Sequence, residues 1–246
     1  MKTTVVTHIY NEEYLLPFWI KHHQKYFDHG IILDYNSTDR SQEIAHELAP
    51  TWEFRKVDIP NFSAVALDDL VNNVEQEIEG TRIVLTITEF LLGNPRNADR
   101  QYFIPQVLLI NMNDNFIFDE NLPFHEQFKW GIGSDTDCIA PWWSRSLHQS
   151  PVNYGSDGSM TGRHYTKIDN GEFLIYRVSN CFVSPKMYRR RLQIQDRIPE
   201  NEKANNMGVQ HTNYNNGLQF KDLLILQNEL RSQSRDLSEL LKKYSM

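Results

Sequence analysis

Apolar residues follow a strand pattern and a helical pattern in turn along the first part of the chain. The strand pattern occurs at residues 3–9, 30–34, 52–59 and 82–87, and the helical pattern at residues 16–27, 38–49 and 62–78. Strands that alternate with helices at this spacing predict a parallel sheet with crossover helices. The polar residues that follow the strands are therefore expected at one edge of the sheet, the edge where such folds bind ligands.

The rest of the chain has a less regular pattern. Residues 106–112 and 173–176 look like strands, residues 113–162 are rich in Asn, Asp, Gly, Ser and Trp, and residues 218–244 are apolar at helical spacing. With 246 residues, 40% of them hydrophobic, the chain can bury one substantial core, so we expect a single domain. Its expected parts are an N-terminal half (1–112), an irregular half (113–217) and a C-terminal helix (218–246).

The composition of the chain argues against some classes of protein. A formal net charge of −7 argues against nucleic acid as the main partner, because nucleic-acid binding draws on clustered Lys and Arg. The one basic run, Arg189–Arg191, is expected in a solvated turn or helix end, with phosphate contact as the alternative. No long apolar run and no signal-peptide pattern is present, so we expect a cytoplasmic protein without a membrane span. Cys138 and Cys181 have no metal-site spacing and are expected to be buried thiols; the oligomeric state stays open.

Several segments in the first part of the chain resemble a known family. Tyr10-Asn11-Glu12-Glu13, Trp19-Ile20-Lys21-His22-His23 and residues 30–41 are similar to the start of family 2-like glycosyltransferases of GT-A fold. The resemblance covers residues 3–93 well and the remainder loosely. It implies an α/β fold with a mostly parallel sheet flanked by helices. It also implies transfer of a sugar from a nucleotide-sugar donor to a hydroxyl of a glycan or glycoconjugate acceptor, with inversion.

The same resemblance implies where the donor and the acceptor bind. Residues 1–112 would form the nucleotide-sugar-binding half and residues 113–217 the acceptor side. Around the donor it would place Thr7, Tyr10, Glu12, Asp34 and Asp39. Taken without the resemblance, Glu12 and Asp39 are explained equally well as acidic residues favoured in the first turn of a helix.

Residues 86–89 raise the question of a metal ion. The resembled subgroup ends its fourth strand with Asp-x-Asp-Glu-Phe, and binds a divalent cation such as Mn²⁺ or Mg²⁺ against the diphosphate. Here Thr86 and Thr88 stand at the two aspartate positions and Glu89 alone is acidic. Hydroxyl groups bring no charge to offset the desolvation of a cation. One interpretation keeps a metal site of Glu89 with His211, which lies in a segment similar to a late His-x-x-Tyr segment of these enzymes.

Two other interpretations stay open. The diphosphate could be neutralised without a metal ion by basic side chains such as Arg163, Lys167 or Arg177. Alternatively, catalysis is lost and the protein is a nucleotide- or glycan-binding module that keeps the scaffold.

An inverting transferase also needs a carboxylate base on the acceptor side. The candidates by position are Asp135, Asp137, Asp157 and Asp169. Aromatic side chains that could stack on a sugar ring are Trp130, Trp142 and Trp143. The sequence does not choose among these residues.

Overall fold

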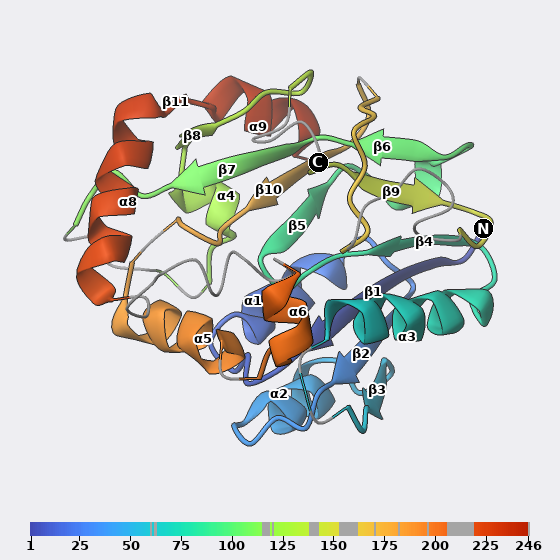
Figure 1. The fold of residues 1–246 in the computed structure, drawn as a ribbon. Coiled ribbons are helices and arrows are strands. Elements are labelled where there is room, and N and C mark those ends of the chain that lie inside the picture. Colours follow the sequence, from blue (N-terminus) through green and yellow to red (C-terminus); the bar gives the residue numbers. More distant parts are fainter. Residues whose placement is uncertain are drawn as a thin grey trace.

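A six-stranded, mostly parallel sheet lies at the centre of the structure (Figure 1). The computed structural model describes residues 1–59, 61, 63–114, 119, 121–137, 143–152, 162–169, 171–181, 183–195, 197–205 and 219–245. The strands, in sheet order, are β3 (Glu53–Lys56), β2 (His29–Asp34), β1 (Thr3–Ile9), β4 (Thr81–Val84), β9 (Arg145–His148) and β6 (Tyr102–Ile104). The first four are mutually parallel, and β9 is antiparallel to both β4 and β6. The predicted α/β fold is confirmed.

A second sheet of five short strands lies beside the first. In sheet order they are β11 (Arg235–Asp236), β8 (Trp130–Ile132), β7 (Gln106–Ile110), β10 (Leu174–Arg177) and β5 (Glu89–Leu92). β10 is parallel to β7 and antiparallel to β5. Glu89 therefore does not end the fourth strand as expected. β4 stops at Val84, a turn follows, and Glu89 begins a strand of the second sheet.

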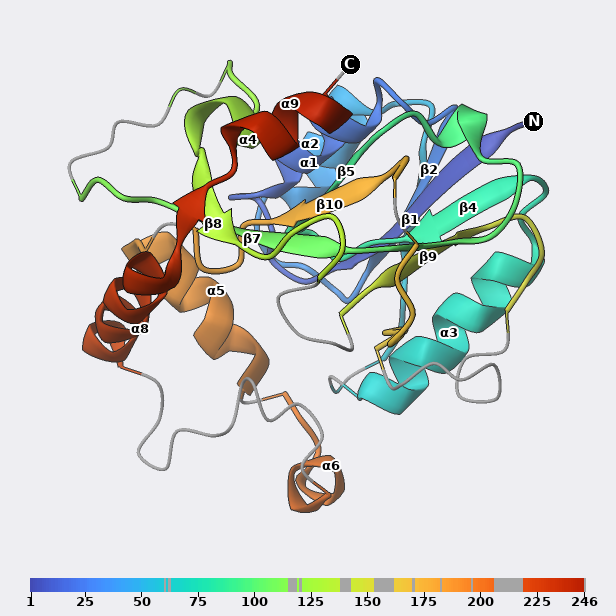
Figure 2. The ribbon, with the colours of Figure 1, turned by 90° about the horizontal axis from the view of Figure 1, so that it is seen from above.

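Helices cover both faces of the six-stranded sheet. The helices of the described residues, on both sheets, are α1 (Leu16–His23), α2 (Ser41–Leu48), α3 (Ala64–Gln76), α4 (Phe124–Gln127), α5 (Pro185–Gln195), α6 (Glu200–Ala204), α8 (Phe220–Gln233) and α9 (Ser238–Tyr244), with a 3₁₀ turn at Pro95–Asn97. Figure 2 shows α3 on one face and α1 and α2 on the other. Neighbouring residues of β1 pack on opposite faces of the sheet. Val5 lies in the core under α1, and Val6 lies in the core under α3.

Side chains of α1 complete the hydrogen bonding of β5, which is the last strand of its sheet. Trp19 Nε1 donates to the carbonyl of Glu89 (3.1 Å) and His22 Nε2 donates to the carbonyl of Leu91 (2.6 Å). The Leu91 amide donates to His23 Nε2 (3.3 Å). An unpaired strand edge is costly to bury, so these contacts explain the Trp19 and His22-His23 positions without invoking catalysis.

The buried histidines of α1 predict that the fold is sensitive to acid. Burial lowers the pKa of His22 to about 3 and that of His23 well below its ordinary value. In the unfolded chain these groups take up protons below about pH 6.5, so the unfolded state binds more protons and stability falls as the pH decreases toward 3. We expect each histidine to reduce the free energy of unfolding by about 2 kcal/mol between about pH 6.5 and 5, measured by urea unfolding.

Two variants control for other titrating groups. The His23→Gln variant loses one of the buried imidazoles and should show a shallower pH dependence, whereas the exposed His46→Gln should keep the wild-type slope. An unfolding free energy that does not change over this pH range would contradict the burial of neutral imidazoles.

The C-terminal segment differs from the single helix that its leucine pattern predicts. α8 ends at Gln233 because Ser234 is extended, with a ψ of 153°. Residues 235–236 then pair with β8 as β11, and α9 follows at an angle to α8 (Figure 1). No helix in the described ranges is both long and apolar enough to cross a bilayer.

Candidate functional site

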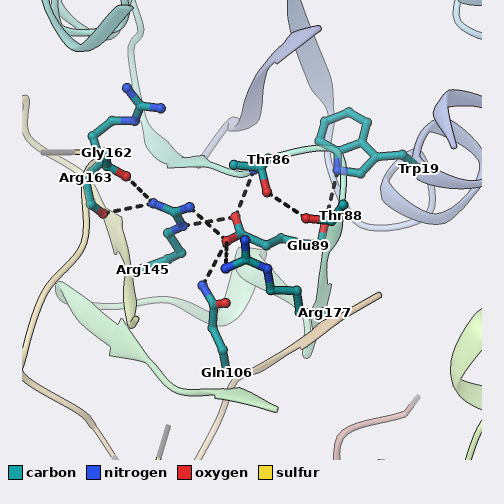
Figure 3. A network of polar contacts seen from close by, with 9 residues as sticks. All are labelled: Trp19, Thr86, Thr88, Glu89, Gln106, Arg145, Gly162, Arg163 and Arg177. Carbon is teal, nitrogen blue, oxygen red and sulfur yellow. Dashed lines mark hydrogen bonds and ion pairs between the residues drawn. The ribbon is translucent and has the colours of Figure 1, made fainter. Parts of the chain in front are cut away.

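A buried carboxylate, Glu89, lies at the centre of a polar network beyond the carboxyl end of β4 (Figure 3). Arg145 of β9 donates to both carboxylate oxygens, from Nη2 to Oε1 (2.8 Å) and from Nε to Oε2 (3.0 Å). The Thr86 amide also donates to Oε2 (2.8 Å), and Gln106 Nε2 donates to Oε1 (3.1 Å). The Glu89 side chain is 0% exposed and Arg145 is 3% exposed. The pair is thus a dry, bidentate ion pair with both of its carboxylate oxygens engaged.

Arg145 takes the place that a metal ion would occupy beside Glu89. Burial acts to raise the pKa of Glu89, but the charges of Arg145 and Arg177 and the hydrogen bonds from Arg145 hold it well below its ordinary range. Thr86 and Thr88 contact each other, at 3.2 Å between hydroxyl oxygens. Across the described residues, no three His, Cys, Asp or Glu side chains are placed to hold a metal ion. The described donor set does not fit a divalent cation; His211 lies outside the described residues, so its role stays a prediction.

Arg177 is a second guanidinium that faces the same carboxylate. Its Nη1 lies 3.9 Å from Glu89 Oε1, beyond hydrogen-bonding distance, and its Nε is buried without a hydrogen-bond partner in the described part of the chain. The guanidinium lies over the Trp143 ring, 4.5 Å from the centroid, and the side chain is 19% exposed. Because Arg145 already neutralises Glu89, the charge of Arg177 is in surplus among the residues that the structure describes here.

The imidazoles of His8 and His164 are buried close to these arginines and are neutral. Burial, together with the charges of Arg163 and Arg145, lowers the pKa of His8 to about 3. Burial also lowers the pKa of His164 to about 2, again with help from Arg145. The Nδ1 atoms of both rings are buried without a hydrogen-bond partner among the described residues. Unpaired buried polar atoms are rare in proteins, so both Nδ1 atoms are available to hydrogen bond with water or with a ligand.

The acidic residues expected around the donor have different roles in the structure. Asp34 accepts from the Ser37 amide and closes the turn after β2. Asp39 accepts from the Ser41 amide (2.9 Å), and also from the Glu13 amide (2.9 Å). Asp39 thus ties the turn after β1 to the turn after β2, whereas Asp34 acts within the turn after β2. They shape the edge of the sheet; whether they also contact a donor stays a prediction. Thr7 is buried within β1, and its hydroxyl has no partner among the described residues.

Helix α5 crosses the edge beside these turns and brings further arginines to it. Arg190 Nε donates to Glu12 Oε2 (2.6 Å), and burial raises the pKa of Glu12 despite this contact. Gln193 Nε2 donates to the Tyr10 carbonyl (2.8 Å). Beyond the helix, the Arg197 guanidinium lies 3.9 Å from the centroid of the Tyr10 ring. Arg190, which pairs with Glu12, is also near enough to Arg177 for its charge to lower the pKa of that guanidinium.

The basic run 189–191 is therefore only partly solvated. Arg189 is exposed, whereas Arg190 binds Glu12 and Arg191 donates to the Ser179 carbonyl (3.1 Å). Of the other basic candidates, Arg163 pairs with Asp68, and Lys167 is exposed over Phe103. Residue type alone does not predict which of these basic side chains pairs with a carboxylate and which is exposed.

The candidate bases on the acceptor side are mostly engaged elsewhere. Asp135 pairs with Lys243 of α9 (2.8 Å), and the hydrogen bond from Lys243 lowers its pKa. Asp169 Oδ2 accepts from the Phe103 amide (2.7 Å), and Asp137 is exposed. Asp157 lies outside the described residues. The identity of the base stays a prediction.

The two described tryptophans among the aromatic candidates lie in different places. Trp130 is 41% exposed and lies on β8 of the second sheet. Trp142 and Cys138 lie outside the described residues. Trp143 stacks against His164 and Arg177, so of the two described tryptophans it is the one that lies at the network.

Arg145 is the functional residue that the sequence interpretation missed. It lies 56 positions from Glu89 in the chain, and no local pattern marks the pair. The available signal was weak: Arg145 lies two residues from Trp143 and two from Leu147, on the same side of a strand as these apolar residues. An arginine buried in this way requires a carboxylate partner.

Comparisons with known proteins give only distant similarities. No family model matches the chain, and no curated protein matches it. Residues 1–349 of Staphylococcus aureus TarS match 80% of this chain at 12% identity and a TM-score of 0.40, and this chain covers 65% of that one. Glucosyl-3-phosphoglycerate synthase from Mycobacterium tuberculosis, in complex with Mn²⁺ and UDP, matches 44% of each chain at 16% identity and a TM-score of 0.32.

A third similarity is to CTP:phosphocholine cytidylyltransferase from Streptococcus pneumoniae. It matches 79% of this chain and 99% of its own at 12% identity and a TM-score of 0.39. Identities and TM-scores this low carry no argument about family or activity. The function has to be argued from the site itself.

Proposed function

We propose that the carboxyl edge of the six-stranded sheet binds a nucleotide-sugar, and that the protein transfers the sugar to a hydroxyl acceptor of a glycan or glycoconjugate. In this proposal arginine side chains take the place of a divalent cation at the diphosphate. The observation that carries it is Arg177, a largely buried guanidinium that is left in surplus by the Arg145–Glu89 ion pair. A surplus buried charge is costly unless an anion matches it.

The chemistry of Arg177 suits a diphosphate. A guanidinium presents several N–H groups in a planar fork that matches phosphate oxygens, and it keeps its charge when buried. Stacking on Trp143 holds the plane of the guanidinium in place. A fixed positive charge beside a departing diphosphate stabilises the negative charge that develops as the sugar leaves.

In this proposal Arg190 is a second arginine at the edge of the sheet that binds the diphosphate. In the absence of a ligand it pairs with Glu12 (2.6 Å), and its charge acts on Arg177 and His8. Because Arg190 and Gln193 both belong to α5, this helix connects the turn after β1 to the arginine cluster. The helix thus supports a nucleotide slot formed by Tyr10, Glu12 and the turns held by Asp34 and Asp39.

A crystal of the protein soaked with UDP, GDP or dTDP, with and without Mn²⁺, tests the proposal. We expect a diphosphate oxygen within hydrogen-bonding distance of Arg177 in both conditions, and Glu89 still paired with Arg145. A Mn²⁺ ion bound to Glu89, or a nucleotide bound away from this edge, would contradict it. Release of UDP from a bound nucleotide-sugar separates a transferase from a binding module, the alternative raised by Thr86 and Thr88.

A further inference from the structure

The Arg197 guanidinium lies at the carboxyl edge of the six-stranded sheet, where three neighbouring strands end. It lies over the Tyr10 ring, 3.9 Å from the centroid, directly after β1. Its Nη1 donates to the Tyr35 carbonyl (3.3 Å), directly after β2, and its Nη2 donates to the Ile59 carbonyl (3.4 Å), after β3. The ends of β1, β2 and β3 thus each supply one contact to the same planar group.

These contacts define the chemistry of a group that fits here. A guanidinium is planar, and it stacks on aromatic faces while its N–H groups point outward in its own plane. The two backbone carbonyls of Tyr35 and Ile59 can only accept hydrogen bonds. A group that takes the place of Arg197 must therefore be flat and must carry two N–H donors on neighbouring nitrogen atoms.

Arg197 is held at this place by weak contacts. Both of its hydrogen bonds to the carbonyls are longer than the usual value of about 2.9–3.0 Å. Arg197 and Tyr10 are also both partly exposed, so the edge is reached from solvent. Because the guanidinium can move into water with its charge hydrated, a better-fitting planar group can displace it.

Guanine is the nucleobase that reproduces the guanidinium of Arg197. Its atoms N1, C2 and N2 form a guanidine group within a flat ring, with N–H donors on both N1 and N2. Uracil and thymine have a single N–H between two carbonyls, and adenine and cytosine have an acceptor nitrogen beside the amino group. Base recognition by stacking on an aromatic side chain and by hydrogen bonds to this edge of the base is common in proteins.

From these features we infer that the nucleotide bound at this edge carries guanine, which replaces Arg197 over Tyr10 and donates from N1 and N2 to the Tyr35 and Ile59 carbonyls. The inference rests on the proposed function, and it makes the donor a guanosine-diphosphate sugar. Arg190 pairs with Glu12, two residues after Tyr10, so the base and the diphosphate lie along the same edge. The arginine contacts to the diphosphate are common to all nucleoside diphosphates, so UDP still binds, but more weakly.

Calorimetry with GDP, inosine diphosphate and UDP tests the inference on the full-length protein. Inosine diphosphate differs from GDP only in lacking the 2-amino group, so it is the matched probe for the second hydrogen bond. GDP should bind at least tenfold more tightly than either of the others, because they leave a carbonyl without its donor. Equal affinities for GDP and inosine diphosphate, or tighter binding of UDP, would overturn the inference alone. Binding of none of the three would overturn the proposed function as well.

Two variants test whether guanine takes the place of Arg197. Arg197→Ala removes the competing guanidinium, so it should strengthen GDP binding severalfold and keep the preference over inosine diphosphate. Tyr10→Leu removes the aromatic face and should weaken GDP binding roughly tenfold. The exposed Arg189→Gln is the control for a lost charge and should change the affinity by less than about threefold. Weaker GDP binding in Arg197→Ala would mean that Arg197 holds the nucleotide, and would overturn the inference.

Discussion

Replacing Arg145 by methionine should lower the free energy of unfolding by about 3–5 kcal/mol. The substitution leaves the Glu89 carboxylate buried at 0% exposure without the two charge-assisted hydrogen bonds from Arg145. In the variant Glu89 must either stay charged in a dry site or take up a proton, and both cost stability. Guanidinium unfolding followed by circular dichroism measures the loss.

Two further variants separate the ion pair from a simple packing effect. The double variant Glu89→Leu/Arg145→Met removes both charges and should recover much of the stability, because a buried pair can often be replaced by apolar residues at little cost. Arg177→Met, on the same carboxylate, should change the free energy of unfolding by less than about 1 kcal/mol, since Arg145 still neutralises Glu89. Equal destabilisation by Arg145→Met and Arg177→Met would refute this division of roles.

The same Arg177→Met substitution should weaken UDP binding by roughly 10- to 100-fold, the effect of losing a charge-assisted hydrogen bond to phosphate. The two arginines that face Glu89 thus differ in kind: one maintains the fold, and the other is free to meet a ligand. The Nε of Arg177 has no hydrogen-bond partner among the described residues. It can therefore donate to a phosphate oxygen without breaking an existing hydrogen bond. Isothermal calorimetry gives the affinity.

Arg189→Gln is the matched control for charge. Arg189 is exposed on α5 next to Arg190, and its removal lowers the net charge of the protein by the same amount. Its effect on UDP affinity should stay within about threefold, because an exposed charge is screened by salt. If Arg189→Gln weakened UDP as much as Arg177→Met, long-range charge rather than a local contact would explain the binding.

Much of the first half of the fold was predictable because its signals are local. Strand β1 follows from residues 3–9, and α1 begins near Leu16 as the position of Pro17 predicts. The strand after residue 29 and the helix after residue 63 also match their apolar patterns within a few residues. In each case a period of two or of 3.6 residues decides the element, whatever it packs against.

What could not be predicted depends on contacts between distant parts of the chain. The leucine pattern of residues 218–244 is compatible with one helix, and only the pairing of Arg235–Asp236 with β8 breaks it. In the same way, the sequence pattern predicts that Glu89 is a metal ligand. In the structure Arg145, far away in the sequence, donates to both of its carboxylate oxygens. The fourth predicted strand extends three residues beyond Val84 because Leu85 and Ile87 continue the apolar alternation into the turn.

The measurement that tests the central claim most directly is the affinity of wild-type protein for UDP, GDP and dTDP by calorimetry, in EDTA and then in Mn²⁺. If arginine charge takes the place of a metal ion, one of these nucleotides binds with the same affinity in both conditions. Binding that requires Mn²⁺, or no binding of any of the three, would contradict the account.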